Sequence, residues 1–230
     1  NATVARLLDA KVVIVTRGGI GLPIDEVTLN CALFEREGVE VIGVILNKVL
    51  PEKLDYIAEF AEKGLRRKGL KLLGVVPHQP MLSCPTLELV REDLESQELN
   101  QTGQIQNIVD HVVIGAMGPA RAAKLFKPGV LLIVPADRDD IIKAAGEYLK
   151  GGGRLAGIAL SDDIAPSNAV LKLAQGFPCP VLLTQLESYT VASRVHDLIV
   201  KIRPGDTEKI RLVRDLIAKH VRLDKILEAI

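Results

Sequence analysis

The chain has 230 residues, of which 48% are hydrophobic, and its 29 Lys and Arg residues balance 29 Asp and Glu residues. This length provides a sizeable core, in one large domain or two small ones. The neutral charge, without a dense basic patch, argues against a nucleic-acid-binding protein. No apolar run reaches the ~18 residues that a membrane-spanning helix needs. We therefore expect neither nucleic acid nor a membrane as a partner.

Three cysteines, Cys31, Cys84 and Cys179, lie far apart in the chain. Their spacing matches no metal-binding pattern and is typical of a reducing compartment. The first residues contain no secretory signal sequence. We therefore expect a cytoplasmic protein without a metal site. The opening stretch NATVARLLDA lacks a methionine and has a helical pattern, which indicates the cut edge of a longer protein.

The first half of the chain alternates between strand-like and helix-like segments. The expected elements are strand 11–16, helix 23–37, strand 39–47, helix 51–68, strand 70–76 and a short helix 86–94. Aromatic residues are scarce, so Val, Ile, Leu and Ala must fill the core, as is typical of buried parallel strands. This rhythm predicts a mostly parallel sheet with right-handed crossovers.

The polar stretch 95–107 interrupts this rhythm, and the second half resumes it. We therefore predict two α/β domains, each with a mostly parallel sheet flanked by helices, over residues 1–98 and 105–230. The expected elements of the second domain are strands 108–117, 130–136, 153–161 and 179–185, helices 119–126, 137–150, 166–175 and 188–201, and one or two C-terminal helices.

The glycines of VVIVTRGGIGLP, residues 12–23, are typical of the start of a phosphate-binding loop. Such a loop also needs G-x-x-x-x-G-K-[ST], in which Lys reaches the phosphates and the hydroxyl binds magnesium. No Lys-Ser or Lys-Thr pair occurs anywhere in the chain. The stretch is therefore interpreted as a strand-to-helix connection, with Pro23 starting the helix. No catalytic residue is predicted.

Three stretches of the first domain are similar to the back half of a dethiobiotin-synthetase-like P-loop domain: VARLLDAKVVIVTRGGIG, GVEVIGVILNKV and LKLLGVVPHQPMLSCPTL. The resemblance implies that the phosphate-binding lysine precedes this segment, so ATP and Mg²⁺ are expected only with an upstream loop. It also implies adenine contact by Asn47, whose amide offers a donor and an acceptor, and by the loop with Pro77 and His78. The alternative is that Asn47 and Pro51 merely form a turn.

Residues 108–220 resemble the DRTGG domain that accompanies dethiobiotin-synthetase-like domains in long bacterial phosphate acetyltransferases. The stretches that carry this resemblance are VIGAMGP, PGVLLIVPADRDDI, AGIALSDDIAP and PVLLTQLESYTVASRV. Asp137 and Arg138 match the DR pair. Where the family usually has T-G-G, this chain has Ser161, Asp162 and Asp163, and aspartates repel the phosphate that glycines would admit.

The aspartates after the two predicted strands are expected to approach one another. If these strands are neighbours, up to five carboxylates face one crevice at the carboxyl edge of the sheet, which disfavours an anion. A magnesium ion there is an alternative, but the preferred interpretation is helix capping. Asp137 would be the N-cap, with Asp139 and Asp140 in the first helical turn.

Thr184, Tyr189 and Thr190 form a second group, at another junction between a strand and a helix. Their hydroxyl groups would cap the helix or bind a polar ligand. The four histidines show no catalytic spacing, and each is interpreted as structural.

These patterns favour a non-catalytic regulatory or oligomerisation protein, a homodimer that senses a nucleotide or another metabolite. One alternative is part of an ATP-dependent ligase or amidoligase, similar to dethiobiotin or cobyrinic acid a,c-diamide synthetase. Another is the regulatory arm of a phosphate acetyltransferase. For the chain as given, we expect weak or no ATP binding.

Overall fold

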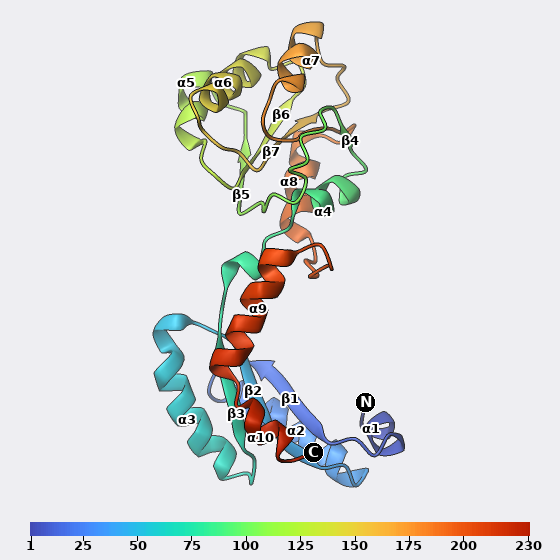
Figure 1. The fold of residues 1–230 in the computed structure, drawn as a ribbon, viewed down its shortest axis with the longest axis vertical. Helices are drawn as coiled ribbons and strands as arrows, with labels where there is room; N and C mark the ends of the chain where they lie inside the picture. Colours follow the sequence, from blue (N-terminus) through green and yellow to red (C-terminus); the bar gives the residue numbers. More distant parts are fainter. The chain divides into compact units, whose positions relative to one another are not determined.

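A computed structural model describes all residues from Asn1 to Ile230. The chain forms two compact α/β units, which confirms the predicted fold class (Figure 1). Unit 1 contains Asn1–Gln79 and Thr207–Ile230, and unit 2 contains Pro80–Asp206. This division differs from the predicted one, because residues 80–98 belong to unit 2 and the C-terminal helices belong to unit 1.

Unit 1 is built on a three-stranded parallel sheet in the order β1-β2-β3. Its elements are α1 (Ala2–Leu7), β1 (Val12–Arg17), α2 (Leu22–Arg36), β2 (Val41–Val49), η1 (Pro51–Lys53), α3 (Leu54–Arg66), β3 (Leu72–Pro77), α9 (Thr207–His220) and α10 (Leu223–Leu227). Helices α2 and α3 bury Val27, Cys31, Ile57, Ala61 and Leu65 in the core beside the sheet.

The two edges of this sheet differ. At β3, Gly74 forms an antiparallel bridge with Val221, and the Arg222 N–H donates to the Leu73 carbonyl at 2.8 Å. The chain after α9 therefore covers this edge. Strand β1 forms the other edge, and Val15 there keeps 59% of its surface exposed.

Unit 2 contains a five-stranded sheet in the order β4-β8-β7-β6-β5. Strands β5 to β8 are parallel and β4 is antiparallel to β8. The elements are η2 (Pro80–Ser83), α4 (Leu87–Asp93), β4 (Gln97–Glu98), β5 (His111–Ile114), α5 (Pro119–Ala122), η3 (Ala123–Leu125), β6 (Val130–Pro135), α6 (Asp139–Lys150), β7 (Gly157–Ser161), α7 (Asn168–Gln175), β8 (Val181–Leu183) and α8 (Ser188–Asp197).

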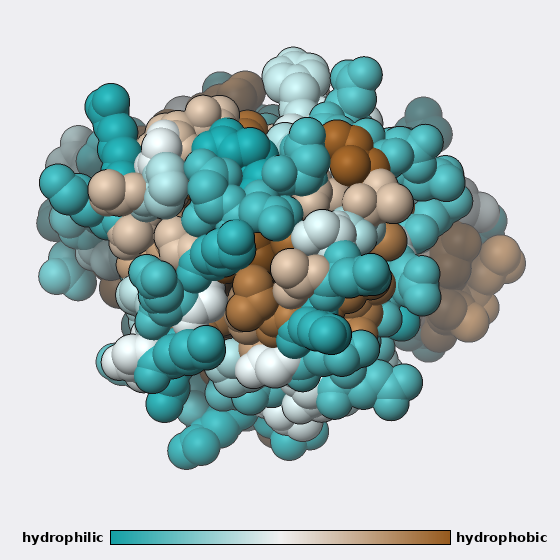
Figure 2. All heavy atoms as spheres, turned by 90° about the horizontal axis from the view of Figure 1, so that it is seen from above, coloured by the Kyte–Doolittle hydropathy of each residue, from teal (hydrophilic) through white to brown (hydrophobic).

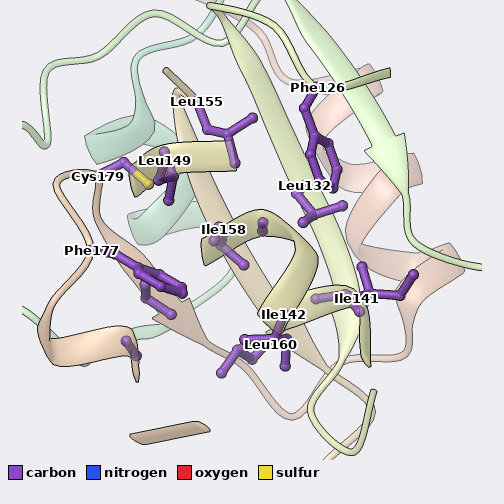
Figure 3. Packing of buried hydrophobic residues seen from close by; sticks show 14 of the residues in the cluster. Phe126, Leu132, Ile141, Ile142, Leu149, Leu155, Ile158, Leu160, Phe177 and Cys179 are labelled. Atoms are coloured by element: carbon purple, nitrogen blue, oxygen red, sulfur yellow. The ribbon is translucent and has the colours of Figure 1, made fainter. Parts of the chain in front are cut away.

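Two hydrophobic cores cover the two faces of this sheet. Alternate residues of β6, such as Leu132 and Leu131, belong to different cores. The larger core packs α5, α6 and α7 on one face, where Ile141, Ile142 and Leu149 lie over the strands (Figure 3). Helices α4 and α8 cover the other face. Helices α5, α6 and α7 share a face of the sheet because they connect consecutive parallel strands through crossovers of the same hand.

The polar segment 95–107 is an integral part of unit 2 rather than a boundary. It contributes β4 and the buried side chain of Asn100. The Asn100 Nδ2 group lies within 2.9–3.2 Å of the carbonyls of Ala174, Phe177 and Cys179. Its Oδ1 accepts the Val181 N–H at 2.7 Å. One amide therefore ties this segment to the α7–β8 connection.

No helix of the chain combines the length and the apolar character that crossing a membrane requires. The face drawn in Figure 2 is predominantly hydrophilic, with hydrophobic residues visible between the hydrophilic ones.

Candidate functional site

Unit 1 brings the residues of the expected adenine pocket to the carboxyl edge of its sheet. Asn47 lies near the end of β2, and Pro77 pairs with Val49 at the end of β3. The backbone N–H of His78 donates to the Val49 carbonyl at 2.6 Å. The Asn47 Oδ1 accepts the backbone N–H of Lys48 at 2.8 Å, whereas its Nδ2 donates to no group of the chain.

The glycines at this edge have structural roles. A Cβ on Gly18 would overlap the side chain of Val49, because β1 and β2 run close together there. Gly21 has φ +97° and immediately precedes α2, whose first turn contains Pro23. These roles explain the glycine-rich sequence without a phosphate.

In unit 2, the side chain of Arg138 acts as a clamp. Its Nε and Nη2 donate to the two carboxylate oxygens of Asp140 at 2.8 and 2.9 Å. Its Nη1 and Nη2 also donate to the carbonyls of Gly115 and Met117 at 3.2 and 3.1 Å. The hydrogen bond from Arg138 holds the pKa of Asp140 below its ordinary value. The guanidinium thus joins the loop after β5 to the first turn of α6.

The prediction that Asp137 caps α6 is wrong. Helix α6 begins at Asp139, and Arg138 occupies the N-cap position without a side-chain capping bond. The Arg138 N–H donates to the Pro135 carbonyl, so Asp137 lies in a turn before the helix. Asp139 and Asp140 do lie in the first helical turn, where their charge is favourable.

Two of the three T-G-G positions, Ser161 and Asp162, form a partly buried polar network with α8. The hydroxyls of Ser161 and Ser188 lie 2.6 and 2.8 Å from the Oδ2 of Asp162, and 2.7 Å from each other. The Ser188 N–H donates to the Asp162 Oδ1 at 3.2 Å. Burial raises the pKa of Asp162, but these hydrogen bonds outweigh it and hold the pKa below its ordinary value. The carboxylate of Asp162 therefore lies at the N-terminus of α8.

The expectation that five carboxylates converge is also wrong. Strands β6 and β7 are neighbours, with Pro135 opposite Ser161. However, the carboxylate of Asp140 accepts a hydrogen bond from Arg138, and the carboxylate of Asp162 accepts one from Ser188. No group of three or more His, Cys, Asp or Glu side chains in the chain is placed to hold a metal ion.

A cavity of about 510 Å³ lies beyond the carboxyl ends of β7 and β8. Its charged lining residues are Glu95, Asp163 and Arg194, and none of them takes part in a salt bridge within the chain. Glu95 and Asp163 have positive φ angles of 49° and 51°. The remaining lining residues are Leu94, Gln97, Ile164, Ala165, Leu183, Thr184, Gln185 and Leu186.

The residues of the second expected group separate in the structure. Thr184 is buried and lines the cavity, but its hydroxyl donates to the Leu94 carbonyl and accepts the Leu186 N–H. Thr190 lies half-buried on α8, and Tyr189 is 78% exposed. Neither lines the cavity. Helix α8 begins at Ser188, and Glu187 precedes it without a capping bond.

Several residues of this region were not predicted from the sequence. Ser188 completes the Asp162 network, and Glu95, Gln97, Gln185 and Arg194 line the cavity. The sequence ESYT marked the start of a helix, but no local pattern indicated that its serine meets a residue 26 positions earlier.

Comparisons with known proteins agree with this two-part organisation. A model of the AAA domain matches residues 1–86, and a model of the DRTGG domain matches residues 89–198. The phosphate acetyltransferase of Pseudomonas putida is 32% identical over 96% of this chain and 33% of its own length. The one from Nitrosomonas europaea is 27% identical over 99% of this chain and 34% of its length. The chain thus spans about a third of the curated relatives that it matches.

A solved structure with similarity to this chain contains the CBS and DRTGG domains of the regulatory region of Clostridium perfringens pyrophosphatase, complexed with diadenosine tetraphosphate. The TM-score is 0.41, with 16% identity over 66% of this chain and 72% of that chain. The chain therefore contains an AAA domain of the dethiobiotin-synthetase-like type followed by a DRTGG domain, an organisation consistent with the N-terminal region of long bacterial phosphate acetyltransferases.

Proposed function

We propose that this chain is a non-catalytic regulatory and assembly region of the phosphate acetyltransferase type, which acts in the cytoplasm. The observation that carries the proposal is the alignment of almost the whole chain with about a third of these enzymes. The absence of a Lys-Ser or Lys-Thr pair supports a non-catalytic role for this chain, because phosphate binding by a P-loop needs that pair.

The cavity of unit 2 is the proposed effector site. Ligands of open α/β sheets gather beyond the carboxyl ends of the strands, where this cavity lies. Its volume of about 510 Å³ is within the range of small-molecule pockets. Two carboxylates and one guanidinium favour a small polar molecule with an amino group over a polyphosphate.

Adenine contact at Asn47 and His78 remains a second part of the proposal. Asn47, whose Nδ2 is unpaired, and His78 lie at the same edge of the sheet. Without a lysine to neutralise the phosphates, the affinity of this chain for ATP is expected to be weak.

The experiment is a calorimetric titration with ATP and with adenosine, with and without Mg²⁺. We expect millimolar or weaker binding that is similar for the two ligands and is reduced by Asn47→Ala. Sub-micromolar ATP binding that depends on Mg²⁺ would overturn the proposal. Regulation is tested in the full-length enzyme, where Asp163→Asn and Arg194→Gln should alter the response to metabolites and leave basal phosphate acetyltransferase activity unchanged.

The match to the AAA domain favours one other function, that of an ATP-dependent ligase. Steady ATP hydrolysis by the 230-residue chain, abolished by substitutions at the unit 1 edge, would support the ligase and contradict the regulatory proposal.

A further inference from the structure

Helix α2 is apolar on two of its faces. Val27 and Cys31 on the inner face are buried in the core of unit 1. On the outer face, Leu22, Leu29 and Leu33 keep 71%, 74% and 44% of their surface exposed. A surface helix normally has a single apolar stripe, and a second one indicates a further partner.

The outer face has the spacing of a helix-pairing seam. Leu22, Glu26, Leu29, Leu33 and Arg36 follow one another at steps of four, three, four and three residues, and all five are exposed. This is the a/d spacing of helices that pack side by side. Neither Glu26 nor Arg36 forms an ion pair within the chain. We call these five residues the α2 seam.

We propose that the α2 seam docks antiparallel onto the α2 seam of a second copy of this chain. With the two-fold axis level with Cys31, Leu29 faces Leu33 of the second copy and Glu26 faces Arg36 of the second copy. The symmetry repeats both contacts, as an isologous interface requires. A parallel arrangement would instead place Glu26 against Glu26 and Arg36 against Arg36, so the charges select the antiparallel one.

The overlap of the two helices sets the strength of the association. Residues 26 to 36 of each copy face one another over about 15 Å of helix. This contact is smaller than a standard protein interface, which buries roughly 800 Å² per partner. The dimer is therefore expected to dissociate on dilution.

The inference deepens the assembly role in the proposed function and rests on it. Different experimental outcomes contradict the assembly role and the α2 seam. A chain that stays monomeric at every concentration contradicts both the assembly role and the α2 seam. A dimer that is insensitive to substitutions in the seam contradicts the seam alone.

The test is sedimentation velocity of the 230-residue chain and its charge-reversal variants over a range of concentrations. Glu26→Arg and Arg36→Glu each place like charges opposite one another twice, so each variant alone should be monomeric. An equimolar mixture of the two variants restores both ion pairs and should form heterodimers. The double variant E26R/R36E should dimerise like the parent chain, whereas Leu29→Gln should dissociate at least tenfold more readily.

Glu35→Arg is the matched control, because Glu35 lies on α2 but outside the seam, and it should leave dimerisation unchanged. Circular dichroism and thermal unfolding establish that each variant folds. The inference is overturned if the single variants dimerise like the parent chain, if their mixture stays monomeric, or if the control has the same effect as the seam variants.

Discussion

The carboxylate of Asp162 receives both the backbone N–H and the hydroxyl of Ser188, at 3.2 and 2.8 Å. Asp162 follows β7 and Ser188 begins α8, so this pair joins a strand end to a helix N-terminus. An anion at a helix N-terminus is stabilised by the unpaired N–H groups and by the helix dipole. In this chain that anion is the side chain of Asp162, at a position where the DRTGG domain usually has glycine.

Replacing Asp162 with Asn should destabilise unit 2 by about 1–3 kcal/mol. Both carboxylate oxygens of Asp162 accept hydrogen bonds, Oδ2 from the two serine hydroxyls and Oδ1 from the Ser188 N–H, whereas an amide replaces one of these acceptors with a donor. Urea denaturation at neutral pH measures the loss. Asp163→Asn is the control, because Asp163 is exposed and also has a positive φ of 51°. Equal stability of the two variants would contradict the role of the network.

The same pair predicts how stability depends on pH. The pKa of Asp162 is lower in the folded protein than its ordinary value, which is about 3.9. The stabilisation is therefore present above about pH 4 and is lost as the pH falls through the folded-state pKa. In urea denaturation, the stability difference between the parent chain and Asp162→Asn should narrow as the pH falls below about 4. A stability difference that stays constant or grows on acidification would contradict the stabilising role of the Asp162 carboxylate.

The alternation of strands and helices was predictable because local runs of apolar residues indicate the strands. Residues 130–136, for example, are almost entirely apolar, and β6 occupies Val130–Pro135. Helix ends were less predictable, since hydrogen bonds such as that of the Arg138 N–H to Pro135 decide where α6 begins. The expected site residues were only partly brought together, because the partners of Asp162 and Arg138 come from other elements.

The domain boundary illustrates why the remainder could not be predicted. A polar stretch normally indicates a linker, but Asn100 bonds to residues 74 to 81 positions further along the chain. Where the chain returns to unit 1, Val221 forms a bridge with Gly74, and the Arg222 N–H donates to the Leu73 carbonyl, about 150 positions earlier in the chain. Such long-range pairings leave no periodic signal in the sequence.

Replacing Asn100 with Ala should destabilise unit 2 by about 3 kcal/mol, because it removes the partners of several buried backbone groups at once. Asn100→Asp keeps the shape and the acceptor for Val181, but places a carboxylate against three carbonyls, so it should be at least as damaging. Chemical denaturation measures both. Gln101→Ala, at the exposed neighbouring position, should have little effect. If Asn100→Ala were equally harmless, the segment would be a linker after all.

Gly18→Ala should destabilise unit 1 by about 1–3 kcal/mol, because the added Cβ overlaps the side chain of Val49. A double-mutant cycle identifies the cause. Combining Gly18→Ala with Val49→Ala makes room for the methyl group, so the double variant should be more stable than the sum of the two single effects predicts. Strict additivity would mean that the glycine serves some purpose other than this close packing.

The three cysteines should differ sharply in reactivity. Burial raises the pKa of the Cys179 thiol to about 12 and also raises that of Cys31. The reactive thiolate is therefore scarce at both positions near neutral pH. Cys84 is only partly buried, and none of the three forms a disulfide. A thiol-specific reagent at about pH 8, below the ordinary thiol pKa of about 8.5, should label the native chain mainly at Cys84. Labelling should stop in Cys84→Ala until urea exposes the two remaining thiols. Rapid native labelling of Cys179 would mean that the larger core of unit 2 opens far more readily than its packing implies.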